Sequence, residues 1–238
     1  MKLIGNWKLE IGNSRLKGGR VGQKINPTGF RIGTFMPWKS RWFVDDTRYK
    51  DYLLEDITIR KALMGKLKLA GITRVEIERL PKSMVIVLIV SRPGVVIGRG
   101  GSGLEDVKKF ILNTLQAVRG KKITDIKIDL QVNEVKNPEL SAYLVASRIV
   151  SELERRIPHR RVVAKTIERV MQSGALGVKI ILSGRIGGAE IGRTEKYHQG
   201  SVPSQTMREN IDYAQIPALL KRGYVGVKVF IHKKQEEE

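Results

Sequence analysis

A glycine-rich segment at positions 98–103 constrains the fold more than any other feature of this sequence. Gly98, Gly100, Gly101 and Gly103 lack the side chains that the interior of a helix or strand needs, so the segment must form a loop. Around it, apolar periodicity predicts a series of elements: a helix over 52–69 stopped by Gly71, strands at 75–80 and 84–90, the glycine loop, a helix through 107–115 stopped by Gly120, and a strand at 126–133. Strict alternation in the last strand places four residues on one face: Ile126, Ile128, Leu130 and Val132. This order predicts an α+β domain in which a helix begins directly after the glycines.

The spacing of Gly98 and Gly101 matches the GxxG loop of KH domains. In such a loop the missing side chains let phosphates approach main-chain N–H groups and the start of the following helix. The order of elements is that of a type II KH domain, so Gly98, Arg99, Gly100 and Gly101 are predicted to form an RNA-binding loop. A glycine turn without a ligand is the alternative, since such turns occur in many folds.

The second half of the chain predicts two helices packed on a sheet. Asn137, Pro138 and Glu139 suit the start of a helix that runs to about Arg156. A second helix follows Pro158 and stops at Gly174. The remainder is strand-like: 178–182, a glycine turn at 184–188, a polar stretch at 189–216, and 225–231. These segments predict a mostly antiparallel sheet that backs the two helices.

The net charge indicates a polyanionic partner. Forty-four Lys and Arg residues against 24 Asp and Glu give +20 at pH 7, while 41% hydrophobic residues suffice for a folded core. Nucleic acid fits better than a membrane, because the charge is spread along a foldable chain and not gathered on an amphipathic helix. A basic enzyme whose charge serves only solubility is the alternative.

Several functional classes find no support in the composition. The absence of cysteine excludes disulfides and thiolate chemistry, and the three widely separated histidines lack metal-ligand spacing, so we expect no metal, cofactor or catalytic residue. The longest apolar run, 84–90, is too short for a membrane span, and the N-terminus has no secretory signal pattern. We expect a cytoplasmic protein.

A basic cluster flanks Pro158. It contains no acidic residue between 155 and 165, and its members are Arg155, Arg156, Arg160, Arg161 and Lys165. Positive charge suits the end of the first helix but opposes the dipole at the start of the second, which suggests an external phosphate. A solvated basic face is the alternative.

Residues 187–194 fit the G-x-x-x-x-G-[KR]-T spacing of a nucleotide-binding P-loop. A P-loop requires a lysine where Arg193 stands and a helix that begins at the threonine. The sequence after Thr194 has no helical periodicity and contains Gly200 and Pro203. We therefore expect a glycine-permitted turn between strands.

Four collinear segments carry a family resemblance: VGQKINPTGFRIG (21–33), RPGVVIGRGG (92–101), NPELSAYLVASRIVSELERR (137–156) and SGRIGGAEIGRTE (183–195). The chain resembles the bacterial small-subunit ribosomal protein family uS3 over about residues 21–232. The resemblance implies an N-terminal type II KH domain, a C-terminal α/β domain and a structural, non-enzymatic role in the head of the small subunit. The implied partners are small-subunit rRNA, neighbouring head proteins and mRNA at the entry channel.

The resemblance assigns the basic cluster to mRNA entry, where family members grip and unwind mRNA without nucleotide hydrolysis. Ala164 stands where the family usually has another basic residue, and the KH loop is richer in glycine than the family pattern. Six further basic residues within the matching span are candidate rRNA contacts: Lys24, Arg31, Lys39, Arg41, Arg185 and Arg193. An RNA-processing or ribosome-assembly enzyme with a KH domain is the alternative function.

The predicted organisation has five parts: an extension (1–20), an N-terminal arm (21–48), the KH domain (49–134), the C-terminal domain (135–232) and a tail (233–238). The arm mixes glycine, proline, basic and aromatic residues, which indicates an extended segment whose aromatics either stack on RNA or pack on the chain itself. Val21 stands where the family begins with methionine. Because a GUG codon can initiate translation, residues 1–20 are either untranslated or a genuine extension.

Overall fold

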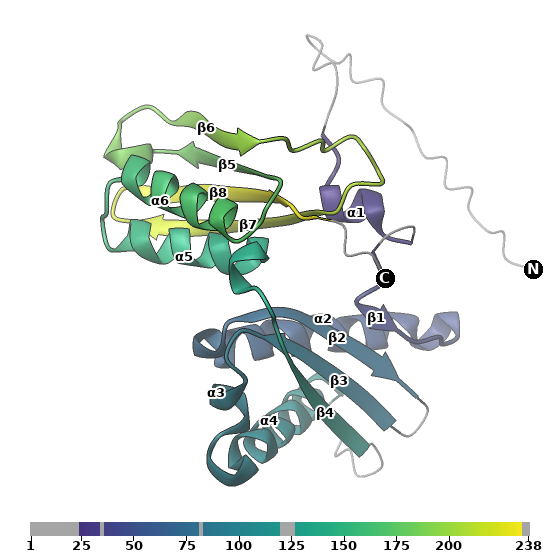
Figure 1. Cartoon of the computed structure of the whole chain (residues 1–238). Helices are drawn as coiled ribbons and strands as arrows, with labels where there is room; N and C mark the ends of the chain where they lie inside the picture. The colour runs from purple at the N-terminus through teal and green to yellow at the C-terminus, as the bar shows by residue number, and fades with distance from the viewer. Residues whose placement is uncertain (1–23, 34–35, 81–82, 120–126, 235–238) are drawn as a thin grey trace, which may run out of the picture.

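The computed structural model describes residues 24–33, 36–80, 83–119 and 127–234, and these form two α+β halves joined by the segment that follows β4 (Figure 1). The extension at 1–20, the helix stop at Gly120, Ile126 and most of the tail lie outside the described residues. None of the helices in the described ranges is long and apolar enough to span a membrane.

The first half has the predicted order of elements around one mixed sheet. The sheet order is β1-β2-β3-β4, with β2 and β3 antiparallel and the two outer pairs parallel. Alternate residues of β3 are buried, as the pleat requires. The elements are α2 (Asp46–Lys66), η1 (Lys68–Ala70), β2 (Ile72–Arg79), β3 (Ser83–Val90), α3 (Pro93–Ile97), η2 (Arg99–Gly101), α4 (Ser102–Arg119) and β4 (Lys127–Glu134).

The arm is not extended throughout, which corrects the prediction for 21–48. Residues Pro27–Arg31 form the short helix α1, capped by the Asn26 side chain, and Ser40–Arg41 form β1, which pairs with β2. The helix predicted from residue 52 begins at Asp46. The prediction missed this start because the first turn is polar and shows no apolar period.

Arg31 holds the arm against the C-terminal half. Its side chain is fully buried and donates hydrogen bonds to the carbonyl oxygens of Pro27 (3.0 Å), Thr206 (2.7 Å) and Glu209 (2.8 Å). Such burial does not fit the predicted role of Arg31 in contacting rRNA. The guanidinium instead joins the end of α1 to the loop before β7.

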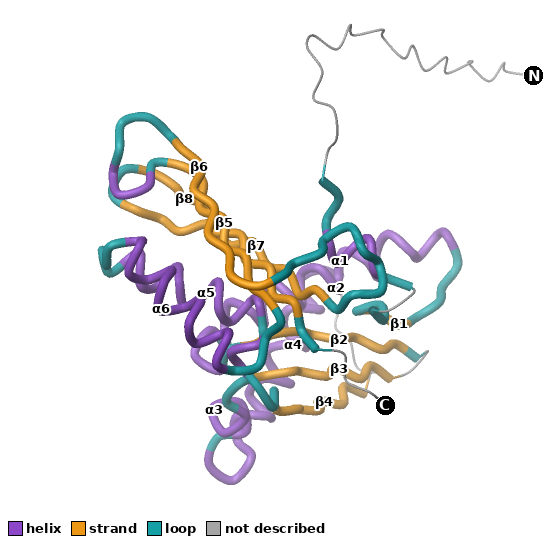
Figure 2. The backbone as a smooth tube through the Cα atoms, turned by 45° about the horizontal axis from the view of Figure 1, so that its top comes forward, coloured by secondary structure: helices purple, strands orange, loops and turns teal. Residues whose placement is uncertain are grey.

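The C-terminal half is a four-stranded antiparallel sheet with α5 and α6 on one face, as predicted (Figure 2). The sheet order is β6-β5-β8-β7, and buried aliphatic residues of β5 and β8 pack beneath both helices. The elements are η3 (Pro138–Leu140), α5 (Ala142–Glu154), α6 (His159–Gln172), β5 (Gly177–Gly184), η4 (Ile186–Gly188), β6 (Arg193–Gly200), β7 (Ile211–Leu220) and β8 (Gly223–His232).

The prediction of one continuous helix from Asn137 to about Arg156 was wrong at its start. A short 3-10 helix breaks at Ser141, and the α-helix runs from Ala142 to Glu154. The Ala142 N–H donates to the Asp212 carboxylate at 3.0 Å, so the cap comes from β7 and not from Asn137. The polar stretch at 189–216 also contains all of β6 and the start of β7.

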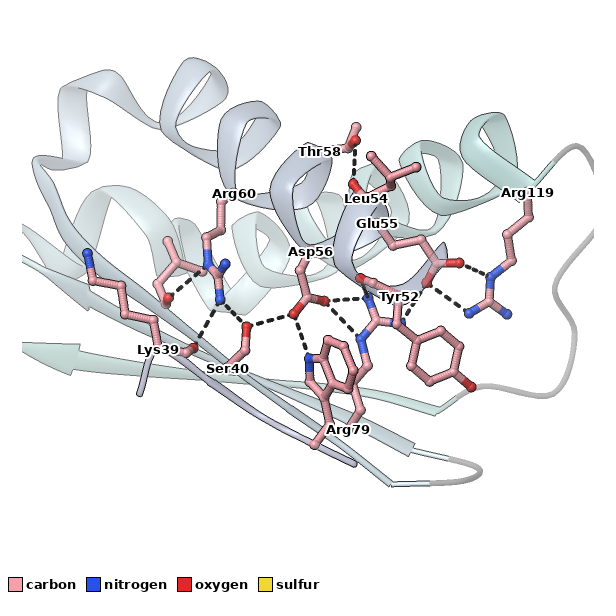
Figure 3. A network of polar contacts seen from close by, with 12 residues as sticks. Lys39, Ser40, Tyr52, Leu54, Glu55, Asp56, Thr58, Arg60, Arg79 and Arg119 are labelled. Atoms are coloured by element: carbon pink, nitrogen blue, oxygen red, sulfur yellow. Dashed lines mark hydrogen bonds and ion pairs between the residues drawn. The ribbon is translucent and has the colours of Figure 1, made fainter. Parts of the chain in front are cut away.

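A buried ionic network joins α2, β2, α4 and the arm (Figure 3). Asp56 accepts hydrogen bonds from Ser40 Oγ (2.7 Å), Trp42 Nε1 (2.8 Å) and Arg79 Nε (2.9 Å). Glu55 accepts from Arg79 Nη1 (2.6 Å) and from Arg119 Nη2 (2.9 Å). Because both carboxylates are almost fully buried, these donors take the place of the water that would otherwise contact their oxygens.

We expect Arg79→Met to destabilise the protein by about 3–5 kcal/mol, because it leaves two buried carboxylates without their shared cation. Arg41→Met is the matched control: Arg41 pairs with Glu78 at 3.0 Å on the exposed side of β1, and its loss should cost less than about 1 kcal/mol. Urea unfolding of both variants measures the difference. Equal losses would contradict a special role for the buried network.

We expect Glu55 to make stability fall in acid. Burial raises the pKa of Glu55, but hydrogen bonds from Arg119 and Arg79 outweigh it and hold the pKa below its usual value. Glu55 therefore stabilises the fold fully above its unfolded pKa of about 4.3, and this contribution is lost as pH falls through the lowered folded pKa. Urea midpoints between pH 6 and pH 3 should fall less steeply for Glu55→Gln. Parallel curves for the two proteins would refute this role.

Candidate RNA-binding surfaces

The glycine loop lies between α3 and α4 at the surface of the first half (Figure 1). Gly98, Gly100 and Gly101 have φ of 68°, 61° and 83°, the left-handed region that glycine tolerates best. A Cβ at Gly103 would lie 2.5 Å from the Val96 carbonyl oxygen, so this position also excludes a side chain. The loop therefore presents exposed backbone at the start of α4, with Arg99 exposed beside it.

The turn between α5 and α6 has an arginine in a glycine position. The Ile157 N–H donates to the Glu152 carbonyl and the Arg156 N–H to the Leu153 carbonyl, which is the Schellman pattern. The first residue after the helix cap in this pattern is normally a glycine in the left-handed region, and here Arg156 occupies that position with φ of 64°. Arg156 is the one non-glycine residue with positive φ in the described part of the chain.

The basic residues in the first two turns of α6 are exposed. Arg160, Arg161 and Lys165 are all exposed, and Arg160 lines a groove of about 520 Å³ between α6 and β6. Arg161 and Lys165 are four residues apart and so lie on the same side of the helix. The five members of the cluster predicted from the sequence are thus all exposed around one turn, and none of them forms an ion pair among the described residues.

Glu195 on β6 anchors the start of α6. Its carboxylate accepts a hydrogen bond from the Tyr197 hydroxyl (2.6 Å), lies 3.0 Å from His159 Nε2 and pairs with Arg193 at 2.7 Å. The Tyr197 hydrogen bond, helped by His159 and Arg193, holds the pKa of Glu195 below its usual value, while burial raises the pKa of Tyr197. These contacts position His159 and with it the first turn of α6.

A second pocket, of about 580 Å³, lies where the α5–α6 turn meets η4 and the β7–β8 turn. Four cationic residues from these three segments line it: Arg156, Arg185, Lys221 and Arg222. The three segments lie at one end of the C-terminal half, the left end in Figure 1. The structure thus brings Arg185, a predicted rRNA contact, next to a member of the basic cluster.

The other predicted rRNA contacts are exposed but dispersed. Lys24 and Lys39 lie on the arm, and partial desolvation of the Lys39 ammonium, together with nearby Arg74 and Arg60, lowers the pKa of this exposed side chain. Arg41 and Arg193 are each engaged by a carboxylate, at 3.0 Å and 2.7 Å. The structure therefore does not gather these residues into one site.

The geometry does not support a nucleotide-hydrolysing site at 187–194. Arg193 begins the strand β6, so the helix that a P-loop requires after Thr194 is replaced by extended chain. Gly187 and Gly188 form the turn η4 between β5 and β6, as the sequence predicted. Within the described ranges, three or more His, Asp or Glu side chains nowhere cluster so that they could hold a metal ion.

A KH fold with an exposed glycine loop, followed by a basic α/β half, defines an RNA-binding protein. Family comparison agrees: the KH domain model matches residues 58–140, and the model for ribosomal protein S3, C-terminal domain, matches residues 149–231. Proteins named small ribosomal subunit protein uS3 are 44% identical in Caldicellulosiruptor saccharolyticus and 47% identical in Salinibacter ruber. Both matches cover 90% of this chain, and they cover 92% and 86% of the relatives.

The chain belongs to the small ribosomal subunit protein uS3 family. The resemblance seen in the sequence and the predicted α+β fold are thereby confirmed. Its members are structural proteins of the ribosome, so the alternative of an RNA-processing enzyme finds no support.

Sequence reasoning missed Lys221 and Arg222. The only sequence signal is a Lys-Arg-Gly turn between two strand-like segments, and strand turns are commonly basic on a protein of this charge. That they line one pocket with Arg156 and Arg185 depends on the register of β7 and β8, which the sequence does not specify.

We expect Arg156→Gly to stabilise the protein by up to about 1 kcal/mol, because relief of about 1–2 kcal/mol in the left-handed conformation exceeds the roughly 0.5–1 kcal/mol of extra chain entropy that glycine loses. The neighbouring Arg155, with φ of −75°, is the matched control, and Arg155→Gly should lower stability. Guanidinium midpoints measure both changes. A loss of stability in Arg156→Gly would show that its side-chain contacts outweigh the backbone cost.

Proposed function

We propose that this protein, beyond its family role as an rRNA-binding component of the small ribosomal subunit, lines the mRNA entry path and grips incoming mRNA with the start of α6. Neighbouring proteins of the subunit head are its proposed protein partners. The gripping residues are those of the basic cluster, Arg155, Arg156, Arg160, Arg161 and Lys165. This grip would help to unwind mRNA structure mechanically, without a nucleotide cofactor.

One observation carries the proposal: the basic residues at the start of α6 are exposed, and none of them forms an ion pair with a carboxylate among the described residues. Cations at a helix N-terminus oppose the helix dipole, so they weaken the fold slightly. An RNA strand would offset this cost, because its phosphates are attracted both by the side chains and by the dipole. Contacts to phosphate ignore base sequence, which suits a path that any mRNA must travel.

The KH loop supports a second RNA contact in the same chain. Its exposed glycine backbone lets a phosphate approach the start of α4 closely. The structure separates this loop from the basic cluster, since the two lie in different halves of the molecule (Figure 1). We assign the loop to rRNA and the cluster to mRNA, so each surface would bind its own RNA.

We expect the triple variant Arg160→Ala, Arg161→Ala, Lys165→Ala to bind single-stranded RNA with a weaker salt dependence. Each lost phosphate contact lowers the slope of log affinity against log salt by about 0.7, so the slope should fall by roughly two. Ribosomes that carry the variant should also pause longer at a stable mRNA hairpin. Fluorescence titration at several salt concentrations and a single-turnover unwinding assay measure the two effects.

The matched control removes the same charge from exposed lysines of the first half: Lys50→Ala, Lys61→Ala and Lys68→Ala. This variant should keep both the slope and the unwinding rate. If the α6 variant behaves like the control, its basic residues are a solvated face and the proposed grip is wrong.

A further inference from the structure

We propose that the pocket lined by Arg156, Arg185, Lys221 and Arg222 is a second binding site for the RNA backbone, separate from the groove along α6. The inference rests on the proposed RNA-gripping function of the C-terminal half and adds a site to it. We call these four residues the turn pocket. It shares no lining residue with the groove beside Arg160.

The charge of the turn pocket is not balanced within the described protein. Its four cations form no ion pair there, and the single acidic lining residue, Glu154, is paired with none of them. Two of the guanidinium groups are held by neutral partners: Arg185 Nε donates to the Ala189 carbonyl at 2.9 Å, and Arg222 donates to the Gly188 carbonyl. Fixed cations that pair with no carboxylate are typical of a site prepared for an external anion.

The backbone of the turn indicates that the side chain of Arg156 is needed. Glycine would fit this left-handed position better, yet the chain places there a residue whose side chain lines the pocket. Left-handed non-glycine residues cost free energy and concentrate at sites where their side chains act. Arg156 comes from the α5–α6 turn, Arg185 from the turn after β5 and Arg222 from the β7–β8 turn, so the cations converge from three separate segments.

Gly188 leaves the space that the Arg222 side chain occupies at the turn pocket. A Cβ at Gly188 would lie 3.2 Å from Arg222 Cδ and would displace that side chain. Ile186, buried in the core, fixes the turn η4 beneath the pocket. The arrangement therefore holds Arg222 at a defined position against Gly188.

Apolar side chains in the same pocket favour a nucleotide over a free anion. Ile157, Pro158 and Leu219 line it together with the cations, and Leu219 remains 59% exposed. A ribose or base can cover such a wall while its phosphate contacts the guanidinium groups, as in single-strand sites that combine apolar contact with charge. A volume of about 580 Å³ is that of a ligand pocket and leaves room for such a group.

The test uses the full-length protein and the variant Arg185→Gln, Lys221→Gln, Arg222→Gln. Glutamine keeps a donor for the Gly188 and Ala189 carbonyls, and the single variant Lys221→Gln, at an exposed turn, serves if the triple variant unfolds. The probes are a single-stranded oligouridylate and an RNA hairpin, which distinguish an mRNA-like strand from an rRNA-like duplex. We expect the salt slope to fall by roughly two for the triple variant, at about 0.7 per lost contact on the single strand.

Arg156→Gly supplies a second test, in which RNA affinity and folding stability should change in opposite directions. It should bind RNA more weakly while unfolding at a higher denaturant concentration, a combination that general damage to the fold cannot produce. Two results would overturn the proposal of an RNA site in the turn pocket. One is an unchanged slope of log affinity against log salt for the triple variant with both probes, and the other is a change no larger than that of the Lys50, Lys61 and Lys68 control.

The α6 variant distinguishes this proposal from the proposed function. If the turn-pocket variant loses affinity and the α6 variant does not, the new site stands and the assignment of the grip to α6 falls. If only the α6 variant loses affinity, the grip stands and the turn pocket falls.

Discussion

Two adjacent carboxylates on the buried side of α2, Glu55 and Asp56, oblige the first half of the chain to assemble as it does. Adjacent anions can be buried only if cations and other donors reach both, and Arg79 on β2 bridges the two. The remaining donors come from the arm and from the end of α4 (Figure 3). The network therefore sets the position of α4 at its end, while the glycine loop defines the start of the same helix.

The chain uses its positive charge in two different ways. Buried arginines are satisfied within the protein, as when Arg31 joins the arm to carbonyl oxygens near β7 and Arg79 balances two carboxylates. Exposed arginines around the α5–α6 turn have no carboxylate partner among the described residues. Since unpaired surface cations repel one another, a fold that gathers them in one place indicates an anionic partner there.

Much of the fold could be read from local patterns, because those patterns reflect local physics. The apolar run at 84–90, the glycines at 98–101 and Gly71 after α2 are all local signals, and the strand, the loop and the helix stop that they predict lie there. The errors arise from partners far away in the sequence. Asp212 caps α5 from seventy residues away, and β6 is polar because it forms an edge of the sheet, so neither could be seen from local periodicity.

The same distinction between local sequence signals and distant partners applies to the candidate sites. The cluster around Pro158 was visible because its residues are neighbours in the chain, whereas the turn pocket forms only when three turns meet at one end of the C-terminal half. The α5–α6 turn contributes to both surfaces: Arg156 lines the pocket, and His159 lines it too while lying 3.0 Å from Glu195 on β6, next to the α6 groove. A single Schellman turn thus contributes side chains to two separate surfaces. At Arg156 the backbone conformation favours glycine, whereas the proposed RNA binding needs an arginine side chain. This conflict lies in a turn because the interior of a helix or strand would not accommodate the left-handed conformation.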